Sequence, residues 1–132
     1  MPKFCVDSSK FFVNELLTNG QKQDIIIGIK FDSNVRTFYG SAEQLNFKQY
    51  QIRLNPRLSK DDILLTLAHE FVHIRQFIEG DLHYITGCTA WRGKQWPIHS
   101  LHYPPFEIEA ENLETILLDM YLAHRKTVRE RT

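Results

Sequence analysis

The sequence has little cysteine, and its charge has no dominant sign. The only two cysteines, Cys5 and Cys88, are too few for a disulfide scaffold, and they lack the CxxC spacing of a thiolate zinc site or a redox pair. We expect both to be reduced, with one disulfide as the alternative. Sixteen basic residues balance sixteen acidic ones, so no large field of one sign points to nucleic acid, an anionic membrane or an acidic partner.

Long hydrophobic runs are also lacking. Asp7 and then Ser8–Lys10 interrupt the apolar start of the chain, so neither a signal peptide nor a membrane span is predicted there. We therefore expect a cytoplasmic protein with no membrane partner. Repeats and low-complexity stretches are missing too, and the 132 residues, 42% of them hydrophobic, predict one folded domain spanning 1–132.

The first half of the chain predicts a helix followed by a small sheet. Ser8 or Ser9 is placed to cap a first helix that runs to about Gly20. Three segments then have the β-branched or alternating pattern of strands, and we expect them to form a mostly antiparallel sheet. These segments are 24–29, 36–40 and 50–54.

The second half predicts two helices separated by a hairpin. Ser59 is a cap for a long helix that should end at Gly80. Arg92 and Gly93 are typical of the turn of a hairpin between residues 85–90 and 95–98. A last helix is expected from Pro105 onward. The fold class is therefore α+β, with a small sheet packed on the central helix and the C-terminal helix.

The segment His69-Glu70-Phe71-Val72-His73 lies within the long helix and predicts a metal site. Residues four apart on a helix project side by side, so His69 and His73 can share a zinc ion. Glu70 lies between them, where a carboxylate can take a proton from a metal-activated water and pass it on. We expect Glu70 to be the catalytic general base. The apolar residues at helical spacing form a separate buried stripe, namely Leu64, Leu67, Phe71, Ile74 and Ile78.

A catalytic zinc usually has three protein ligands and one open position, so a third ligand is needed. The spacing of a metzincin is excluded because Glu79 stands where its third histidine would be, and a zinc deaminase is excluded because only Cys88 is nearby. A helix that crosses the first can aim one carboxylate at the metal and another at a ligand histidine. Glu107 and Glu111 are four apart and share a face of the last helix.

Three parts of the sequence, together, resemble known metallopeptidases. They are His69–His73, the Trp91-Arg92-Gly93 turn and Tyr103–Ala110. Within the last, Glu107-Ile108-Glu109-Ala110-Glu111 is similar to the E-x-x-A-[DN] motif of gluzincin-like enzymes, with Glu111 where Asp or Asn is usual. Over Leu64–Ala110 the chain resembles small phage- and bacterium-encoded proteins with an HExxH…PxExEA pattern.

This resemblance implies a minimal zincin-like domain with Glu107 as the third zinc ligand. It also implies that Glu111 or Glu109 orients an imidazole, and that the strand Tyr50–Leu54 pairs with an extended substrate. A phage-encoded member would act in the cytoplasm of its host. At least one glutamate of this helix should simply be solvated in its opening turns, and we expect Glu109 and Glu114 to have that role.

Other residues offer alternatives for the remaining roles. His83, His99 or His102 could supply the third ligand, in the manner of SprT-like proteases. If they bind no metal, a donor is still needed opposite the zinc to stabilise the oxyanion of the transition state. Tyr103, just before Glu107, is the best placed, and Tyr84, His99 and His102 are the other candidates.

The function predicted from the sequence is zinc-dependent hydrolysis of a peptide bond in a protein or peptide substrate. The first alternative is a metal-binding regulatory or interaction domain without proteolysis. A SprT-like protease with a third histidine ligand is another. A hydrolase acting on nucleic acid is the least favoured, because the net charge is zero and no basic run lies near the motif.

Overall fold

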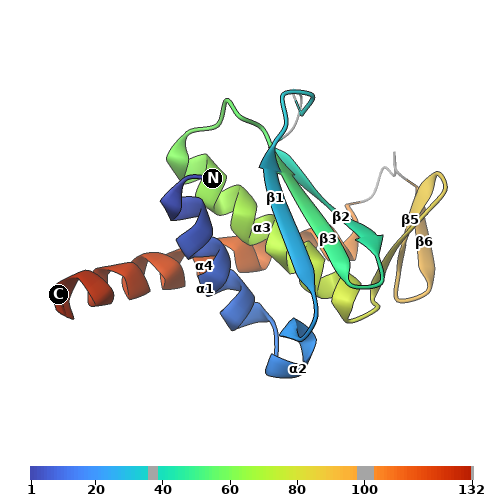
Figure 1. Ribbon diagram of the computed structural model, residues 1–132. Coiled ribbons are helices and arrows are strands. Elements are labelled where there is room, and N and C mark those ends of the chain that lie inside the picture. The colour runs from blue at the N-terminus through green and yellow to red at the C-terminus, as the bar shows by residue number, and fades with distance from the viewer. Residues whose placement is uncertain (36–38, 98–102, 132) are drawn as a thin grey trace.

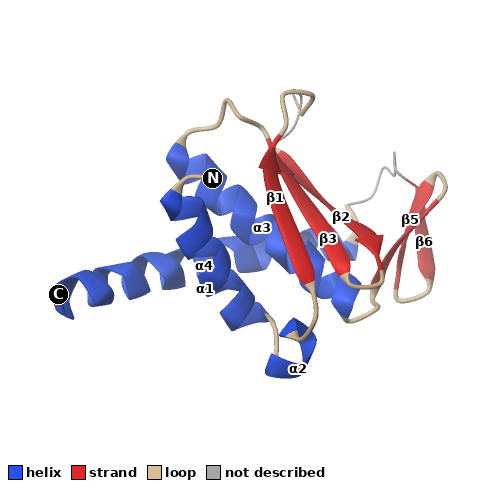
Figure 2. Ribbon diagram, in the orientation of Figure 1, coloured by secondary structure: helices blue, strands red, loops and turns tan. Residues whose placement is uncertain are grey.

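The computed structural model describes residues 1–35, 39–97 and 103–131, and in them the α+β class is confirmed. Figure 1 shows the helices gathered on one side of the first sheet, and Figure 2 shows the second sheet standing apart from it. The elements are α1 (Lys3–Leu16), α2 (Asn19–Lys22), β1 (Ile26–Phe31), β2 (Gly40–Asn46), β3 (Gln49–Leu54), α3 (Lys60–Ile78), β4 (Leu82–Ile85), β5 (Cys88–Trp91), β6 (Lys94–Pro97) and α4 (Pro105–Arg131).

The first sheet has the strand order β1-β3-β2, with β1 parallel and β2 antiparallel to β3. The second sheet, β4-β5-β6, is antiparallel throughout, so the sheets are mostly antiparallel, as predicted. The expectation that Tyr50–Leu54 pairs with an extended substrate is wrong, because β3 is already hydrogen-bonded to β1 and β2. The edge strands are β1 and β2, and β2 is the edge strand that packs against α3.

The first helix differs from its prediction at both ends. It begins at Lys3, and Ser8 and Ser9 are buried within it rather than capping it. The Ser8 hydroxyl donates to the Phe4 carbonyl at 2.7 Å, which satisfies it inside the helix. Gly20 lies in the separate short helix α2. The helix begins before Ser8 because α1 packs against α3, and Cys5 is already part of its buried face.

The strand predicted at 36–40 is only partly covered, because residues 36–38 lie outside the described residues. β2 runs on from Gly40 through a polar stretch that shows little hydrophobic alternation. Gly40 permits the close approach of this strand to α3. A Cβ atom there would lie 2.8 Å from both the Arg53 carbonyl oxygen and Thr66 Cγ2. The glycine therefore sets the spacing between β2 and the central helix.

The central helix α3 follows its prediction closely. The Ser59 side chain accepts a hydrogen bond from the Asp62 backbone N–H, and Gly80 ends the helix with a φ of 79°. The predicted stripe is buried except at Ile78, which is half-buried. Polar residues on the opposite side are buried as well, namely Thr66, Glu70, His73 and Gln76. The metal motif thus lies inside the protein, between α3 and its neighbours.

The predicted hairpin is confirmed around its turn. Arg92 and Gly93 have φ angles of 49° and 83°, as a type I′ turn requires, and they join β5 to β6. The sequence did not predict β4, which pairs with the other side of β5. Trp91 is buried and packs on Phe106 with ring centroids 6.1 Å apart. This contact connects the second sheet to the start of α4.

Two further expectations concern cysteine and membranes. Cys5 and Cys88 are both free, so the expectation of reduced thiols is confirmed. No helix in the described part of the chain combines the length and apolar character needed to cross a membrane.

Candidate metal centre

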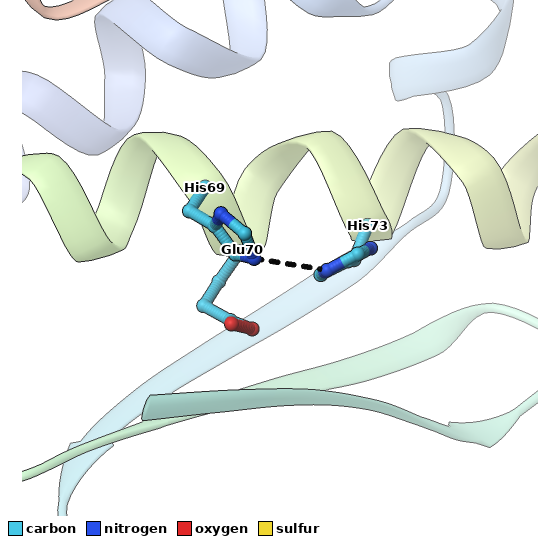
Figure 3. Close-up of side chains that lie close together, drawn as sticks. All are labelled: His69, Glu70 and His73. Atoms are coloured by element: carbon cyan, nitrogen blue, oxygen red, sulfur yellow. Dashed lines mark hydrogen bonds between the residues drawn. The ribbon is translucent and has the colours of Figure 1, made fainter. Parts of the chain in front are cut away.

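His69 and His73 project from one side of α3, and their imidazoles face each other (Figure 3). Their Nε2 atoms are 3.2 Å apart. Zinc–nitrogen bonds of about 2.0–2.1 Å in a tetrahedral site place two nitrogens about 3.3 Å apart. The spacing of the two histidines therefore suits a shared zinc ion.

Glu107, in the first turn of α4, completes this arrangement. One oxygen of its carboxylate contacts His73 Nε2, and the other is 3.5 Å from His69 Nε2. The carboxylate thus faces the same point as both imidazole nitrogens. Two imidazoles and one carboxylate are a usual protein ligand set for a catalytic zinc.

The outer nitrogens of the imidazoles are also bound. His69 Nδ1 lies 2.8 Å from Glu114 Oε2, and His73 Nδ1 lies 2.7 Å from Gln76 Oε1. Since a carboxylate and an amide oxygen only accept, each Nδ1 carries the proton when the ring is neutral, and each Nε2 keeps its lone pair. Two lone pairs 3.2 Å apart repel each other unless a proton or a cation lies between them. The tautomers set by Glu114 and Gln76 therefore prepare both rings for a metal.

A buried hydrogen-bond network fixes Gln76 in turn. Its Nε2 donates to the Phe106 carbonyl and to Glu109 Oε1, at 3.1 Å each. Arg75 lies 3.6 Å from the same Glu109 oxygen. His69 contacts Glu114 of α4, whereas Gln76, further along α3, contacts the earlier residue Glu109. The two helices therefore run in opposite directions past the site.

The charges of the site depend strongly on one another. Burial lowers the pKa of His69, but hydrogen bonds and charges from Glu107, Glu70 and Glu114 outweigh it and raise the pKa to about 9. The pKa of His73 is raised in the same way, against its burial. Burial opposes ionisation of Glu107, yet the two histidines lower its pKa to about 2. Since a metal binds only the unprotonated nitrogen of an imidazole, a divalent cation would compete with protons for both Nε2 atoms.

Glu70 lies beside this cluster and is only 5% exposed. Its ligand atom and those of His69 and His73 all lie within 4.8 Å of one another. Burial raises the pKa of Glu70, and its Oε2 has no hydrogen-bond partner. Glu70, His69 and Glu107 all line one cavity of about 300 Å³. A buried carboxylate oxygen that needs a donor lies next to three groups that could bind a metal, and this arrangement fits a centre that activates water.

Glu111 and the two tyrosines predicted from the sequence, Tyr103 and Tyr84, differ in how close they come to the site. The Tyr103 hydroxyl donates to Glu111 Oε1, and burial together with Glu111 raises the pKa of Tyr103. Glu111 lines the cavity beside Glu107, whereas Tyr103 is 52% exposed. Tyr84 donates to the Ala42 carbonyl oxygen at 3.2 Å. Neither phenol is among the described residues that line the cavity.

The alternative histidine ligands are not brought to the pair in the described part of the chain. His83 is exposed on β4, while Glu107 is the residue that faces both Nε2 atoms. His99 and His102 lie outside the described residues. Glu107 is therefore the third ligand that the geometry favours.

Sequence reasoning missed the two residues that hold the imidazoles directly, Gln76 and Glu114, and it named Glu111 or Glu109 for this role instead. The expectation that Glu109 and Glu114 are simply solvated is wrong, because Glu109 holds Gln76 and Glu114 holds His69. Spacing offered a signal for Gln76 and Glu114. Glu114 is seven residues after Glu107, hence on the same face of α4, and Gln76 is three residues after His73.

Removing the Glu114 carboxylate should weaken zinc binding. In Glu114→Ala, His69 loses the partner that fixes its ring, and such losses typically cost about 10–100-fold in metal affinity. Competition with a chromogenic chelator measures the change. Asp119→Ala, an exposed position on the same helix, is the matched control and should keep the affinity of the unaltered protein. Equal affinities in the two variants would show that Glu114 does not support the site.

Comparison of the chain with models of protein families, with curated proteins and with solved structures gives no match. We therefore infer function from the residues of the site and their geometry.

Proposed function

We propose that the chain is a zinc-dependent peptide-bond hydrolase of the zincin type, with a gluzincin-like ligand set. His69, His73 and Glu107 would hold the zinc ion, and Glu70 would be the general base. The observation that supports this most is the convergence of two imidazole Nε2 atoms and the Glu107 carboxylate on one point beside a buried, unpartnered glutamate oxygen. The resemblance of residues 107–111 to the gluzincin helix motif, and of residues 64–110 to small proteins with an HExxH…PxExEA pattern, agrees with it.

A zinc ion bound there would supply Lewis acidity, which lowers the pKa of a water molecule and polarises a substrate carbonyl. Glu70 would accept a proton from that water and later return it to the leaving amine. Burial suits Glu70 to this task, because a raised pKa brings a carboxyl closer to neutral pH, where it can both accept and donate. Glu114 and Gln76 keep the imidazoles in place during these transfers.

Protein or peptide is the proposed substrate class, and the cytoplasm is the proposed compartment. Two free cysteines agree with a reducing environment. The cavity beside the site is bordered by Gly40 at the start of the edge strand β2 and by Thr66 of α3. A substrate entering there reaches Glu70 and Glu107 together.

Peptide hydrolysis that depends on zinc tests the proposal. Zinc-loaded protein should release new amino termini from a defined peptide mixture. Treatment with a chelator should stop the release, and added zinc should restore it. If zinc-loaded, folded protein releases none from peptides or from denatured proteins, the hydrolase proposal is wrong.

One observation favours a second candidate, a metal-binding regulatory domain without hydrolysis. Tyr103, the residue predicted to stabilise the oxyanion, is half-exposed and bonded to Glu111 instead of lining the cavity. Such a domain would bind zinc through the same ligands. It would differ from the hydrolase in needing no proton transfer by Glu70.

A further inference from the structure

We propose that the cavity beside the candidate centre is a specificity pocket for a cationic group of the substrate. This inference rests on the proposed hydrolase function, because it assigns that cavity to a substrate. The group is an ammonium or guanidinium, supplied either by a lysine or arginine side chain or by the free amino terminus of a peptide.

The charge of the cavity walls carries the first part of the inference. Four glutamates line it, and no lysine or arginine is among its described lining residues. A zinc ion would supply only two positive charges against the four carboxylates, which are Glu70, Glu107, Glu111 and Glu114. Against the four formal negative charges of the glutamates, a net negative charge would remain in excess. A cation entering the cavity would compensate it.

Glu70 gives a second observation, besides the charge of the walls. Its side chain is 95% buried, since only 5% is exposed, and its Oε2 has no hydrogen-bond partner. A buried carboxylate oxygen without a donor is costly. Because Glu70 lines the cavity itself, the walls present an acceptor that is not yet satisfied to whatever enters.

The shape of the cavity suits a side chain with an apolar stem. Leu65 and Tyr39 supply apolar surface, while Glu111 and Glu114 supply charge. Lysine and arginine characteristically place their methylene groups on apolar surface and their charged ends at polar partners. The volume of about 300 Å³ is at the lower end of ligand sites, which suits one side chain rather than a long segment.

Gly40 keeps one wall of this pocket free of a side chain. A Cβ atom at this position would collide with the Arg53 carbonyl oxygen and with Thr66, at 2.8 Å each. The wall is therefore formed by the backbone of β2, close to the carboxylates of α4. A larger residue could not be placed here without moving β2 away from α3.

Binding of matched small probes to the zinc-loaded protein tests the pocket directly. The probes are acetyl-arginine amide and acetyl-citrulline amide, which differ in charge but hardly in shape. Chemical-shift titration should show that the arginine probe binds at least about tenfold more tightly, the ratio expected when a charged partner is lost. Alanyl-alanine amide, with and without an acetyl group, tests the amino-terminal source in the same way.

Glu111→Gln is the informative variant, because it removes one cavity charge and leaves the three proposed ligands intact. We expect the preference for the charged probe to fall to within about threefold. Glu130→Gln, an exposed position at the far end of α4, should keep the full preference. Both variants should hold one zinc ion per chain.

The outcomes separate this inference from the proposed function. If charged and neutral probes of both kinds bind equally and the protein still cleaves peptides, the pocket proposal is wrong and the hydrolase proposal is not affected. Preferential binding of a cation without any cleavage would support the pocket and contradict the hydrolase. A second zinc ion per chain that is lost in Glu111→Gln would also overturn the pocket, since the cavity would then be a metal site.

Discussion

Glu70→Gln should abolish peptide hydrolysis while the protein keeps its zinc. Glutamine has the same shape as the buried glutamate but cannot accept a proton, and the three proposed ligands are unchanged. General-base catalysis contributes about 10²–10⁴-fold, so we expect kcat/KM to fall by about a thousandfold. The rates should be compared at equal zinc content, measured by elemental analysis. Glu79→Gln, an exposed glutamate at the end of the same helix, is the matched control and should keep full activity.

The same variant separates the two candidate functions. A regulatory domain would need the metal and the surface but no proton transfer, so Glu70→Gln would keep its biological activity. Unchanged hydrolysis in a variant with a full zinc complement would contradict the role of Glu70 as general base. Loss of zinc together with activity would instead place Glu70 among the ligands, close to His69 and His73.

Glu107→Gln should lower the affinity for zinc more than any change outside the ligand set. The Glu107 carboxylate faces both Nε2 atoms, and its pKa is lowered to about 2 by the histidines, so it is ionised at neutral pH. Replacing it by an amide removes the charge that compensates the cation. Since positioning residues already cost about 10–100-fold, a lost ligand should cost more than about 100-fold.

Chelator competition measures this affinity, and thermal unfolding with and without zinc provides a second readout. Zinc should raise the melting temperature of the unaltered protein and leave that of Glu107→Gln nearly unchanged, because a ligand stabilises only the state that it binds. Glu111→Gln is the matched control, four residues further along α4. If Glu107→Gln binds zinc strongly and Glu111→Gln does not, Glu111 is the third ligand instead of Glu107.

The motif on α3 could be predicted from the sequence because every feature of it is local. The four-residue spacing places His69 and His73 on one side of a helix, and Ser59 and Gly80 mark the helix ends in the structure as in the sequence. The turn at Arg92 and Gly93 is equally local. Such features depend on backbone geometry within a few residues, so one sequence is enough to predict them.

What could not be predicted depends on how distant elements pack. The partners of the imidazoles follow from the antiparallel register of α3 and α4, which brings Glu114 to His69 and Glu109 to Gln76. Sequence spacing shows that Glu107 and Glu114 share a face but not which residue of α3 they meet. The solvated interpretation of Glu114 was wrong for this reason.

The same limit explains the errors in the first half of the chain. Local signals favoured a cap at Ser8 or Ser9. The helix instead begins at Lys3, because Cys5 is buried in the core as part of the helix. β2 has a polar sequence, and pairing with β3 maintains the strand despite the weak pattern. In both cases tertiary contacts outweigh local preference.

Anomalous diffraction at the zinc absorption edge tests the central claim most directly. Crystals should be grown from zinc-loaded protein that has never passed over a metal-chelating column. We predict a single anomalous peak about 2.0–2.2 Å from His69 Nε2, from His73 Nε2 and from a carboxylate oxygen of Glu107. A well-ordered site without a peak, or a peak bound by the two histidines without Glu107, would contradict the account.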